Sequence, residues 1–582
     1  MSKHHFDVII IGSGVAGALC AWKLTQLDKK CRVLILEAGD NEITSGQRIE
    51  FHHMMDTQGS RGDMYAPYVD LESRLFAPAP ENAQKELKDQ KDDDAKGDRR
   101  AYYDYTTGPN GSKDPFKAGY NRMVGGSTWS WRGNTPRYLP SDFKLKSTYG
   151  VGRDWPIDYY ELEPWYAEAE AELGVSGNHD EIDGLFGAYR SRNFPMTGIP
   201  LTYSDTVIKR KIDGKKVRNT TVRVVTTPQA RNSKAYDGRP ACEGHSNCIP
   251  LCPIQAKYDA TVHLRKLPAD RVELRKAAVV SRLEKDASGS KVMTVTYKNW
   301  RHEPATEESV TAPIVVLAAN AIETPKLLLM SGNLANSSDQ VGRNLMDHAQ
   351  FEIIASFPEA VFPFRGPQSV TAIEDFRDGD FRKQRSGFRM TIGNDGWGRA
   401  GSPATVIDRL LEAGKYGSQL PKAVSDEIPK MIRLSFSTEM LPDPNNRIEV
   451  STKVDQELGL PRPMFTFEIG EYTKNGLREG QAAAMELFGL MGATVGKQLR
   501  DLEPAGGGFN WNTAAHIMGT CIMGDDPKTS VVDRWGRTHD VPNLWVVGSS
   551  VFTTSATSNP TITIAALALR TATAIHRQMS AK

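Results

Sequence analysis

The sequence contains no long apolar run. Of its 582 residues 39% are hydrophobic, and no stretch approaches the roughly 18 consecutive apolar residues that a membrane-spanning helix requires. The first predicted strand begins near Phe6, which leaves no room for the charged segment, apolar segment and cleavage site of a secretion signal. We therefore expect neither a transmembrane helix nor an export signal in this chain.

Charge and cysteine are also limited. The 72 Lys and Arg residues nearly balance the 71 Asp and Glu residues, for a net charge of +1, so nothing indicates a nucleic-acid partner or an anionic membrane. The 6 cysteines do not form the pattern of a disulfide framework. We expect Cys20 and Cys31 to be buried, inert thiols, and Cys521 has no cysteine nearby in the sequence. The chain length allows two or three domains, or one large two-lobed enzyme.

The other three cysteines form a dense group. Cys242, Cys248 and Cys252 are spaced C-x5-C-x3-C and are followed by Pro253. Iron–sulfur clusters need thiolates at such density, and a proline often follows the last ligand. Zinc with His245 as a fourth ligand fits less well, because zinc sites usually show C-x2–4-C spacing, and three unrelated cysteines are a further alternative. Three ligands without an obvious fourth favour a three-iron, four-sulfide (3Fe-4S) cluster.

The N-terminal segment has the order of a dinucleotide-binding unit. A β-branched run over residues 7–11 is typical of a strand buried on both faces. It leads into the motif Gly12-Ser13-Gly14-Val15-Ala16-Gly17. In such a motif the first glycine permits a tight turn, the second a close approach to a pyrophosphate, and the third helix–strand packing. The second strand ends in Glu37, where a carboxylate can bind ribose hydroxyls and disfavours a 2′-phosphate. FAD or NAD is therefore favoured over NADP.

Later segments favour FAD and a domain assembled from distant pieces. Val279 and Val280 suit a strand edge beside an adenine, and residues 314–319 form a second buried strand followed by a helix. Gly125 and Gly126 permit close backbone approach to a flavin. The sequence also predicts an amphipathic helix over Tyr159 to Leu173, a solvated charged insertion over 84–100, strands over 431–440 and 464–469, and a helix over 476–491.

Two polar residues near the C-terminus are candidates for catalysis. His516 precedes a glycine-rich turn, and Asn559 precedes Pro560 and Thr561. Oxidation of an alcohol needs a base for the hydroxyl proton, and the pKa of imidazole suits that role near neutral pH. Asn559 could hold the same oxygen or the flavin edge. On these residues alone, a structural histidine in the core is the favoured interpretation of His516.

Several motifs together resemble the glucose–methanol–choline (GMC) oxidoreductase family over nearly the whole chain. They are the glycine motif with Glu37, residues 124–127, 318–320 and 341–348, His516 with G-T-x-x-M-G, and Asn559-Pro560-Thr561. Within the family, residues 142–156 and 230–254 resemble the large flavoprotein subunits of bacterial FAD-dependent glucose and fructose dehydrogenases. In those subunits a cluster is bound by cysteines that match Cys242, Cys248 and Cys252.

The resemblance implies an α/β fold with a Rossmann-type FAD-binding domain and a discontinuous α+β substrate domain. We assign 1–50, 110–140, 225–350 and 505–582 to the FAD-binding domain, including the cluster loop 240–255, and 150–225 and 350–505 to the substrate domain. It also implies that His516 is the catalytic base and Asn559 its partner. The candidate FAD-binding residues are Gly12, Ser13, Gly14, Val15, Ala16, Gly17, Glu37, Gly125, Gly126, Ser127, Val280, Ala318, Ala319, Gly548, Asn559, Pro560 and Thr561.

The same resemblance implies an assembly. A small subunit with a twin-arginine signal would export the large one, and a cytochrome c would accept the electrons. The expected location is therefore periplasmic and membrane-associated through partner subunits, with the cytoplasm as the alternative.

Some residues depart from the pattern. Ala515 stands where glucose dehydrogenases of this group have Asn, which argues against oxidation at C1 of glucose, and residues 135–138 look more like pyranose 2-oxidase. Those oxidases tether FAD through a histidine at the position of Ser130, so we expect non-covalent FAD. The resulting hypothesis is a dehydrogenase of a sugar, glycoside or polyol, with oxidation at C1, C2 or C3 open. A sugar oxidase and a non-catalytic electron-transfer or scaffold subunit are the alternatives.

Overall fold

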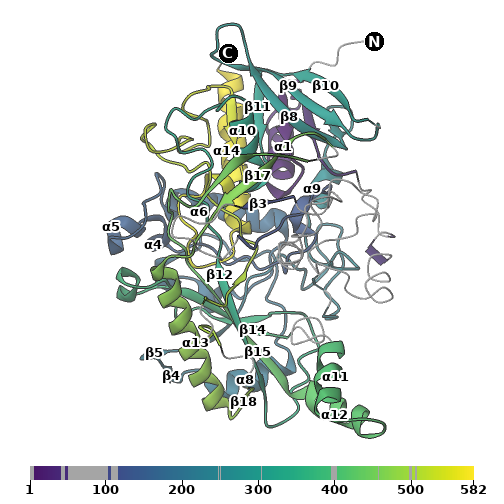
Figure 1. Ribbon diagram of the computed structural model, residues 1–582, viewed down its shortest axis with the longest axis vertical. Coiled ribbons are helices and arrows are strands. Elements are labelled where there is room, and N and C mark those ends of the chain that lie inside the picture. Colours follow the sequence, from purple (N-terminus) through teal and green to yellow (C-terminus); the bar gives the residue numbers. More distant parts are fainter. Residues whose placement is uncertain are drawn as a thin grey trace.

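The computed structural model describes most of the chain. The described residues are 6–40, 46, 48–49, 102–105, 116–246, 248–249, 251–302, 304–394, 403–455, 458–496, 501–504 and 508–581. The charged segment 84–100 lies outside them. The molecule is elongated, with a parallel sheet and its helices at one end and a larger antiparallel sheet at the other (Figure 1).

A five-stranded parallel sheet is built from distant parts of the sequence. Its strand order is β20-β11-β1-β2-β7. The inner strands are continuous apolar runs that are buried throughout, as expected for a sheet covered on both faces. The bounds are β1 Val8–Ile11, β2 Val33–Leu36, β7 Val272–Arg275, β11 Ile314–Leu317 and β20 Leu544–Val546. The strands predicted over 7–11, 32–36 and 314–319 are thereby confirmed, and so is the Rossmann-type unit.

Helices cover this sheet. α1 (Val15–Leu27) packs against α14 (Thr561–Ser580), and α14 packs against α6 (Tyr159–Leu173). The predicted amphipathic helix is confirmed as α6, which begins after Asp158, whose carboxylate accepts a hydrogen bond from the Glu161 amide at 2.8 Å. α10 (Asn320–Met330) follows β11 directly. These contacts join the two ends of the described chain in one layer.

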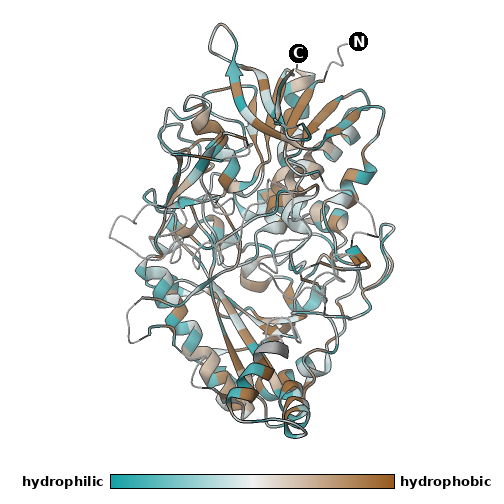
Figure 2. Ribbon diagram, turned by 45° about the vertical axis from the view of Figure 1, so that its right-hand side comes forward, coloured by the Kyte–Doolittle hydropathy of each residue, from teal (hydrophilic) through white to brown (hydrophobic). Residues whose placement is uncertain are grey.

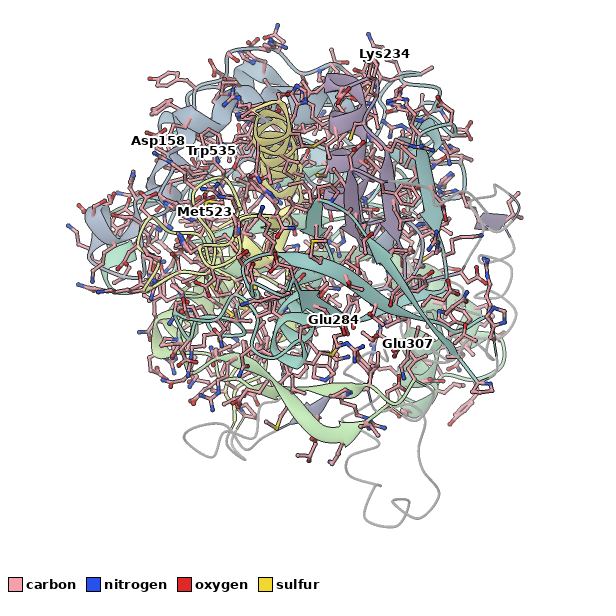
Figure 3. The ribbon with its side chains drawn as sticks, turned by 90° about the horizontal axis from the view of Figure 1, so that it is seen from above. Asp158, Lys234, Glu284, Glu307, Met523 and Trp535 are labelled. Carbon is pink, nitrogen blue, oxygen red and sulfur yellow. The ribbon has the colours of Figure 1, made fainter. Side chains whose placement is uncertain are left out.

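A three-stranded antiparallel sheet extends the end of the molecule that contains the parallel sheet. It has the order β10-β9-β8, from β8 (Ala278–Lys285), β9 (Val292–Asn299) and β10 (Thr306–Thr311). Figure 3 shows Glu284 and Glu307 on this sheet, while Asp158 and Trp535 lie on the other side of α14. Cys20 and Cys31 are buried, as predicted, at 0% and 1% exposure, and burial raises the pKa of both thiols.

The second domain is a seven-stranded sheet. Its order is β18-β12-β15-β14-β13-β6, with β19 also paired to β12. α13 (Glu471–Met491) packs on β12 and β15. Figure 2 shows brown, apolar strands inside and teal residues on the outer helices. The strand bounds are β6 Val224–Thr226, β12 Ala349–Ser356, β13 Thr371–Ile373, β14 Phe388–Gly393, β15 Met431–Thr438, β18 Thr494–Val495 and β19 Asn512–Thr513.

The prediction of a strand over 464–469 is partly wrong. The strand is β17 (Pro461–Thr466), and it pairs with β16 (Arg447–Val454) and β3 (Asp104–Tyr105) rather than with the seven-stranded sheet. The predicted helix 476–491 begins earlier, at Glu471. The shorter elements are α4 Pro140–Phe143, α5 Leu145–Tyr149, α7 His179–Ile182, α8 Tyr203–Ile212, α9 Thr261–Lys266, α11 Pro403–Glu412, α12 Gln419–Glu427, β4 Lys216–Val217 and β5 Thr220–Thr221.

Among the helices that the structure describes, none is long and apolar enough to cross a bilayer.

Gly17 is the position at which helix α1 approaches the sheet most closely. A Cβ there would lie 2.0 Å from the Gly12 carbonyl oxygen and 3.3 Å from Ala318 Cβ. We expect Gly17→Ala to lower the free energy of unfolding by about 1–3 kcal/mol, because this backbone contact cannot relax without moving α1. Denaturant unfolding measures the change. Gly489→Ala in α13, where a Cβ meets no atom within 4 Å, is the matched control and should be neutral or stabilising.

Candidate active site

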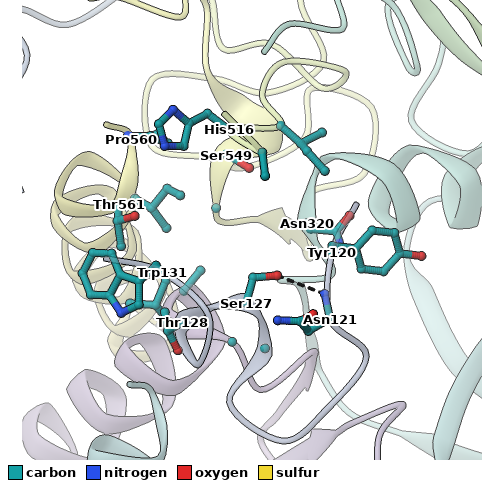
Figure 4. Close-up of a pocket in the computed structure, with 18 of the residues that line it drawn as sticks. Tyr120, Asn121, Ser127, Thr128, Trp131, Asn320, His516, Ser549, Pro560 and Thr561 are labelled. Carbon is teal, nitrogen blue, oxygen red and sulfur yellow. Dashed lines mark hydrogen bonds between the residues drawn. The ribbon is translucent and has the colours of Figure 1, made fainter. Parts of the chain in front are cut away.

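A continuous pocket lies between the parallel sheet and the seven-stranded sheet. It begins at the carboxyl ends of the parallel strands, where open α/β folds bind ligands, and it reaches residues of β12, β14 and β15. Figure 4 shows His516 and Pro560 across the pocket from Asn121 and Asn320. The residues predicted from the sequence that line it are Gly12, Ser13, Gly14, Val15, Ala16, Glu37, Gly126, Ser127, Val280, Ala318, Ala319, His516, Gly548, Asn559, Pro560 and Thr561.

Two predicted cofactor residues, Gly17 and Gly125, do not line the pocket. Gly17 faces the Gly12 carbonyl, so its role is the helix–strand contact described above. Gly125 has φ +92°, and a Cβ there would lie 2.7 Å from Trp129 Nε1. Its amide donates to Ser13 Oγ at 3.0 Å. Gly125 therefore holds the second glycine loop against the first, while Gly126 and Ser127 form the surface.

Glu37 has a structural task besides the expected one. Its Oε2 accepts hydrogen bonds from the Ser13 amide at 2.9 Å and from Ser13 Oγ at 2.6 Å, and its Oε1 accepts from the Gly39 amide at 2.8 Å. Burial raises the pKa of Glu37, and these hydrogen bonds oppose the rise. A carboxylate has about four acceptor positions. Glu37 uses three of them to hold the glycine turn and Gly39, and a further one remains for a ligand in the pocket that it lines.

The shape and the backbone of the pocket fit FAD. A Cβ on Gly14 would meet no protein atom within 4 Å, so the space beside this residue is open to a pyrophosphate. Helices α1 and α14 both begin at the pocket, with Val15 and Thr561 in its wall. Their unpaired N-terminal amides and positive helix ends favour phosphate and anionic flavin edges. These residues would hold the dinucleotide.

His516 is held in place by a buried carboxylate. Asp347 Oδ1 accepts hydrogen bonds from the backbone amides of His516 at 2.8 Å and His348 at 2.7 Å. Its Oδ2 accepts from Thr513 Oγ1. Burial raises the pKa of Asp347 to about 6, and these hydrogen bonds counteract it. Ala515, just before the histidine, has φ +55°, so the chain turns sharply as it enters the pocket.

The side chains of His516, His348 and Asn559 form a connected chain. His516 Nδ1 lies 2.9 Å from His348 Nδ1, and His516 Nε2 lies 3.1 Å from Asn559 Nδ2. Burial lowers the pKa of His516 well below its ordinary value, and the neighbouring His348 and Arg132 lower it further. His516 is therefore neutral at pH 7, which a general base must be.

Sequence reasoning missed the polar wall opposite the nucleotide. Gln350 of β12 and Arg389 of β14 both pair in register with Ser437 of β15, and all three line the pocket. Thr391 and Ser435 form the next row. The available signal was polar residues at every second position of three β-like runs, which places them on one face of a sheet. His348 was visible within the motif 341–348, although it received no role.

The cysteine loop adjoins the same pocket. Ile249, next to Cys248, is part of the pocket wall. Cys248 and Cys252 are buried, at 5% and 6% exposure, and Cys242 is partly buried. Burial raises the pKa of the Cys242 thiol. Within the described residues, however, no three His, Cys, Asp or Glu side chains have an arrangement that could hold a metal ion.

Two buried basic side chains donate hydrogen bonds to this loop. Arg231, 1% exposed, donates from Nη1 to Cys248 Sγ at 2.9 Å. Lys257, also 1% exposed, donates to the carbonyl oxygens of Trp129 at 2.7 Å and Cys248 at 2.8 Å, and to that of Trp131. Lys257 thus links the loop to the segment 126–132, of which every residue except Trp129 lines the pocket.

The fold and the site define an FAD-dependent oxidoreductase that acts on CH–OH groups. Models described as GMC oxidoreductase match residues 151–350 and 442–568, and one described as an NAD(P)-binding Rossmann-like domain matches residues 10–82. The chain belongs to the GMC oxidoreductase family.

Several relatives are similar along most of their length. The chain is 36% identical to the fructose dehydrogenase large subunit of Gluconobacter japonicus, over 98% of this chain and 97% of that protein. It is 28% identical to 2-methyl-1,2-propanediol dehydrogenase of Mycolicibacterium austroafricanum (100% and 96% covered). It is 26% identical to the gluconate 2-dehydrogenase flavoprotein of Pantoea cypripedii (78% and 79%). The crystal structure of a pyridoxine 4-oxidase from Mesorbium loti has the same fold, with a TM-score of 0.59 at 18% identity and coverage of 98% and 99%.

A substitution at Gly14 can weaken cofactor binding without affecting folding. Its φ of −62° suits alanine, and the added methyl would enter the open space of the pocket. We expect Gly14→Ala to fold normally but to lose about 1–3 kcal/mol of FAD binding. Flavin absorbance of the purified protein and far-ultraviolet circular dichroism measure the two properties. Full FAD occupancy in the Gly14→Ala protein would show that the pyrophosphate does not lie at this turn.

Proposed function

We propose that this protein is an FAD-dependent dehydrogenase that oxidises a hydroxyl of a sugar, glycoside or polyol to a carbonyl, with electrons passing through a 3Fe-4S cluster to a cytochrome c. FAD, when bound, supplies the acceptor for the hydride that leaves the carbinol carbon. His516 takes the hydroxyl proton on Nε2, and Asn559 orients the same oxygen.

The observation that carries the proposal is a neutral histidine in the wall of the pocket that the glycine turn also lines. His516 lines the same pocket as Gly14, Glu37 and Val280. Its Nε2 faces Asn559, and its pKa is lowered by burial. An imidazole held neutral beside the expected flavin edge is suited to remove a hydroxyl proton in the same step as C–H cleavage.

A polyhydroxylated substrate fits the polar wall. Gln350, Arg389 and Ser437 line the pocket. Gln350 Nε2 donates to Ser435 Oγ at 2.8 Å, and Arg389 Nε donates to Glu374 at 2.6 Å, so protein partners hold these side chains in the wall. A wall of polar side chains that binds substrate hydroxyls selects against apolar alcohols. Relatives named as dehydrogenases of fructose, gluconate and a propanediol support the same class. FAD is expected to be non-covalent, because Ser130 lines the pocket where the related oxidases have the tethering histidine, and the lining histidines His348 and His516 bind each other.

Cys242, Cys248 and Cys252 would hold the cluster, which supplies a one-electron relay when present. The donors fit in kind: none of these cysteines is in a disulfide, and the Arg231 guanidinium donates to Cys248 sulfur, as it would to a thiolate. Both ring nitrogens of His245 are buried without a hydrogen-bond partner among the described residues, a further sign that the loop surrounds a group. Because Ile249 lines the pocket, electrons leaving the flavin would have a short path.

The partners follow from the same interpretation. A relative named as a large subunit supports an assembly in which a small subunit carries the export signal and a cytochrome c accepts the electrons. The expected place of action is the periplasmic face of the membrane, reached through these partners.

Replacement of His516 tests the catalytic assignment. We expect His516→Ala to retain FAD and to slow anaerobic flavin bleaching by its sugar about 10²- to 10⁴-fold, because no base remains. Titration of the purified holoenzyme with sugars, glycosides and polyols identifies the substrate first. His539→Ala, whose ring hydrogen-bonds Ser530 outside the pocket, should keep the wild-type rate. Normal turnover of the His516→Ala protein with bound FAD would overturn the assignment.

The cluster has its own test. We expect low-temperature paramagnetic resonance of the oxidised protein to show a three-iron signal that disappears on reduction and is absent in Cys248→Ser, which keeps its FAD. Cys31→Ala, far from the loop in sequence, should retain the signal. Absence of iron from wild-type protein isolated anaerobically, together with peroxide formation at the full turnover rate, would instead support a sugar oxidase.

A further inference from the structure

His348 and His516 are joined nitrogen to nitrogen. Their Nδ1 atoms are 2.9 Å apart, and the rings meet edge to face at 87° with centroids 5.0 Å apart. A hydrogen bond of this length requires that one of the two nitrogens carries a hydrogen and the other a lone pair. The question is which ring donates.

The hydrogen bond of the other His348 nitrogen, Nε2, determines which ring donates. His348 Nε2 lies 3.0 Å from the Ala556 carbonyl oxygen, and a carbonyl oxygen accepts hydrogen bonds but never donates them. The hydrogen of a neutral His348 is therefore on Nε2, and its Nδ1 has the lone pair. His516 must then donate from Nδ1, which leaves the lone pair of its Nε2 directed toward Asn559 and the pocket.

The proton count agrees with this chain of bonds. Burial lowers the pKa of His348 to about 4, and the pKa of His516 is lowered as well, so each ring has one hydrogen at pH 7. The charged groups that face the pair are the Asp347 carboxylate, which accepts from both backbone amides, and the guanidiniums of Arg132 and Arg377, which disfavour protonation. No further proton is needed or available.

We propose that His348 is a positioning residue that keeps His516 in the tautomer with hydrogen on Nδ1, so that Nε2 has the lone pair that a base needs. This inference rests on the proposed function. As the alcohol O–H bond breaks, a bond would form between that hydrogen and His516 Nε2, and the O–H electron pair would become the second bond of the carbonyl group. The carbinol hydrogen would leave with the C–H electron pair as a hydride, for which FAD, when bound, supplies the acceptor. The His516 Nδ1–H group then donates a charge-assisted hydrogen bond to His348 Nδ1, which stabilises the cation.

Without the acceptor on His348, the alternative tautomer becomes available. His516 could then hold its hydrogen on Nε2, where it would donate to the amide oxygen of a flipped Asn559 and could not act as a base. Ala556 determines the choice, because its carbonyl belongs to a buried segment: Ser555, Ala556 and Thr557 all have 0% exposure. The tautomer of His516 thus depends on Ala556, whose carbonyl oxygen accepts a hydrogen bond from His348 and not from His516 itself.

Two variants of His348 separate the tautomer from packing. His348→Leu removes the acceptor, whereas His348→Asn keeps an oxygen close to the position of Nδ1. We expect the Leu variant to reduce its flavin about 10- to 100-fold more slowly at saturating substrate, with the substrate dissociation constant little changed. The Asn variant should recover most of the rate. Stopped-flow flavin reduction under anaerobic conditions gives both parameters.

A second readout does not depend on turnover. Nitrogen-15 spectra of histidine-labelled holoenzyme without substrate distinguish a protonated ring nitrogen from one with a lone pair. We expect His516 Nε2 to be unprotonated in wild-type protein and in the Asn variant, and to be at least partly protonated in the Leu variant. If His348→Leu does not fold, the wild-type spectrum and the Asn variant still decide the matter.

The outcomes distinguish this inference from the proposed function. A protonated Nε2 on His516 in wild-type protein, or a Leu variant that reduces flavin at the wild-type rate, would overturn the role of His348. If His516→Ala were also fully active, the proposed base itself would be wrong. If His516→Ala were inactive while the Leu variant were normal, only the tautomer inference would fail.

Discussion

Parallel pairing of β1 with β11 is the interaction on which the rest of the structure depends. Ile11 lies opposite Leu317, and the Ala318 amide continues the ladder by donating to the Ile11 carbonyl at 2.8 Å. This places the Gly12 turn against Ala318 and Ala319, and pairing of β20 with β11 brings Gly548 to the same edge. Three segments that are hundreds of residues apart in sequence thereby form one nucleotide site at the carboxyl ends of the strands, where helix N-termini also meet.

The candidate catalytic residues lie where this edge meets the seven-stranded sheet. Asp347 and His348 directly precede β12, so the strand that contributes Gln350 to the polar wall also anchors the segment of His516. A base placed by a strand and a buried carboxylate is held more rigidly than one on an exposed loop. That rigidity suits a proton transfer that requires alignment with a C–H bond over the flavin.

The cysteine loop shares a wall with the flavin pocket instead of forming a separate module. Lys257 connects the backbone of Trp129 and Cys248, and Trp129 packs with Leu251 and Met123 in a small apolar cluster. Lys257 is 1% exposed at this junction, and this burial lowers its pKa to about 8. If the cysteine loop holds the proposed cluster, only packed side chains would separate it from a bound flavin.

The sequence by itself determined the local features. Short stretches of sequence suffice to recognise the glycine turn after a β-branched run, Glu37 at the end of the next strand, helix α6 and the dense cysteine group. Each depends on turn geometry or burial periodicity within a few tens of residues. His516 and Asn559 were recognisable through the motifs around them. The strand predicted over 464–469 was misplaced because an apolar run does not indicate where pairing begins or with which sheet.

Only the tertiary structure decided which distant residues meet. The contact between His348 and His516 spans 168 positions, and the alignment of Gln350, Arg389 and Ser437 depends on strand register across three segments. The position of Ile249 in the pocket wall depends on how a loop without regular structure packs. Such contacts arise from sheet order and packing, which no local pattern encodes. The candidate residues His516 and Asn559 could therefore be named from sequence, while the hydrogen bond between His348 and His516 could not.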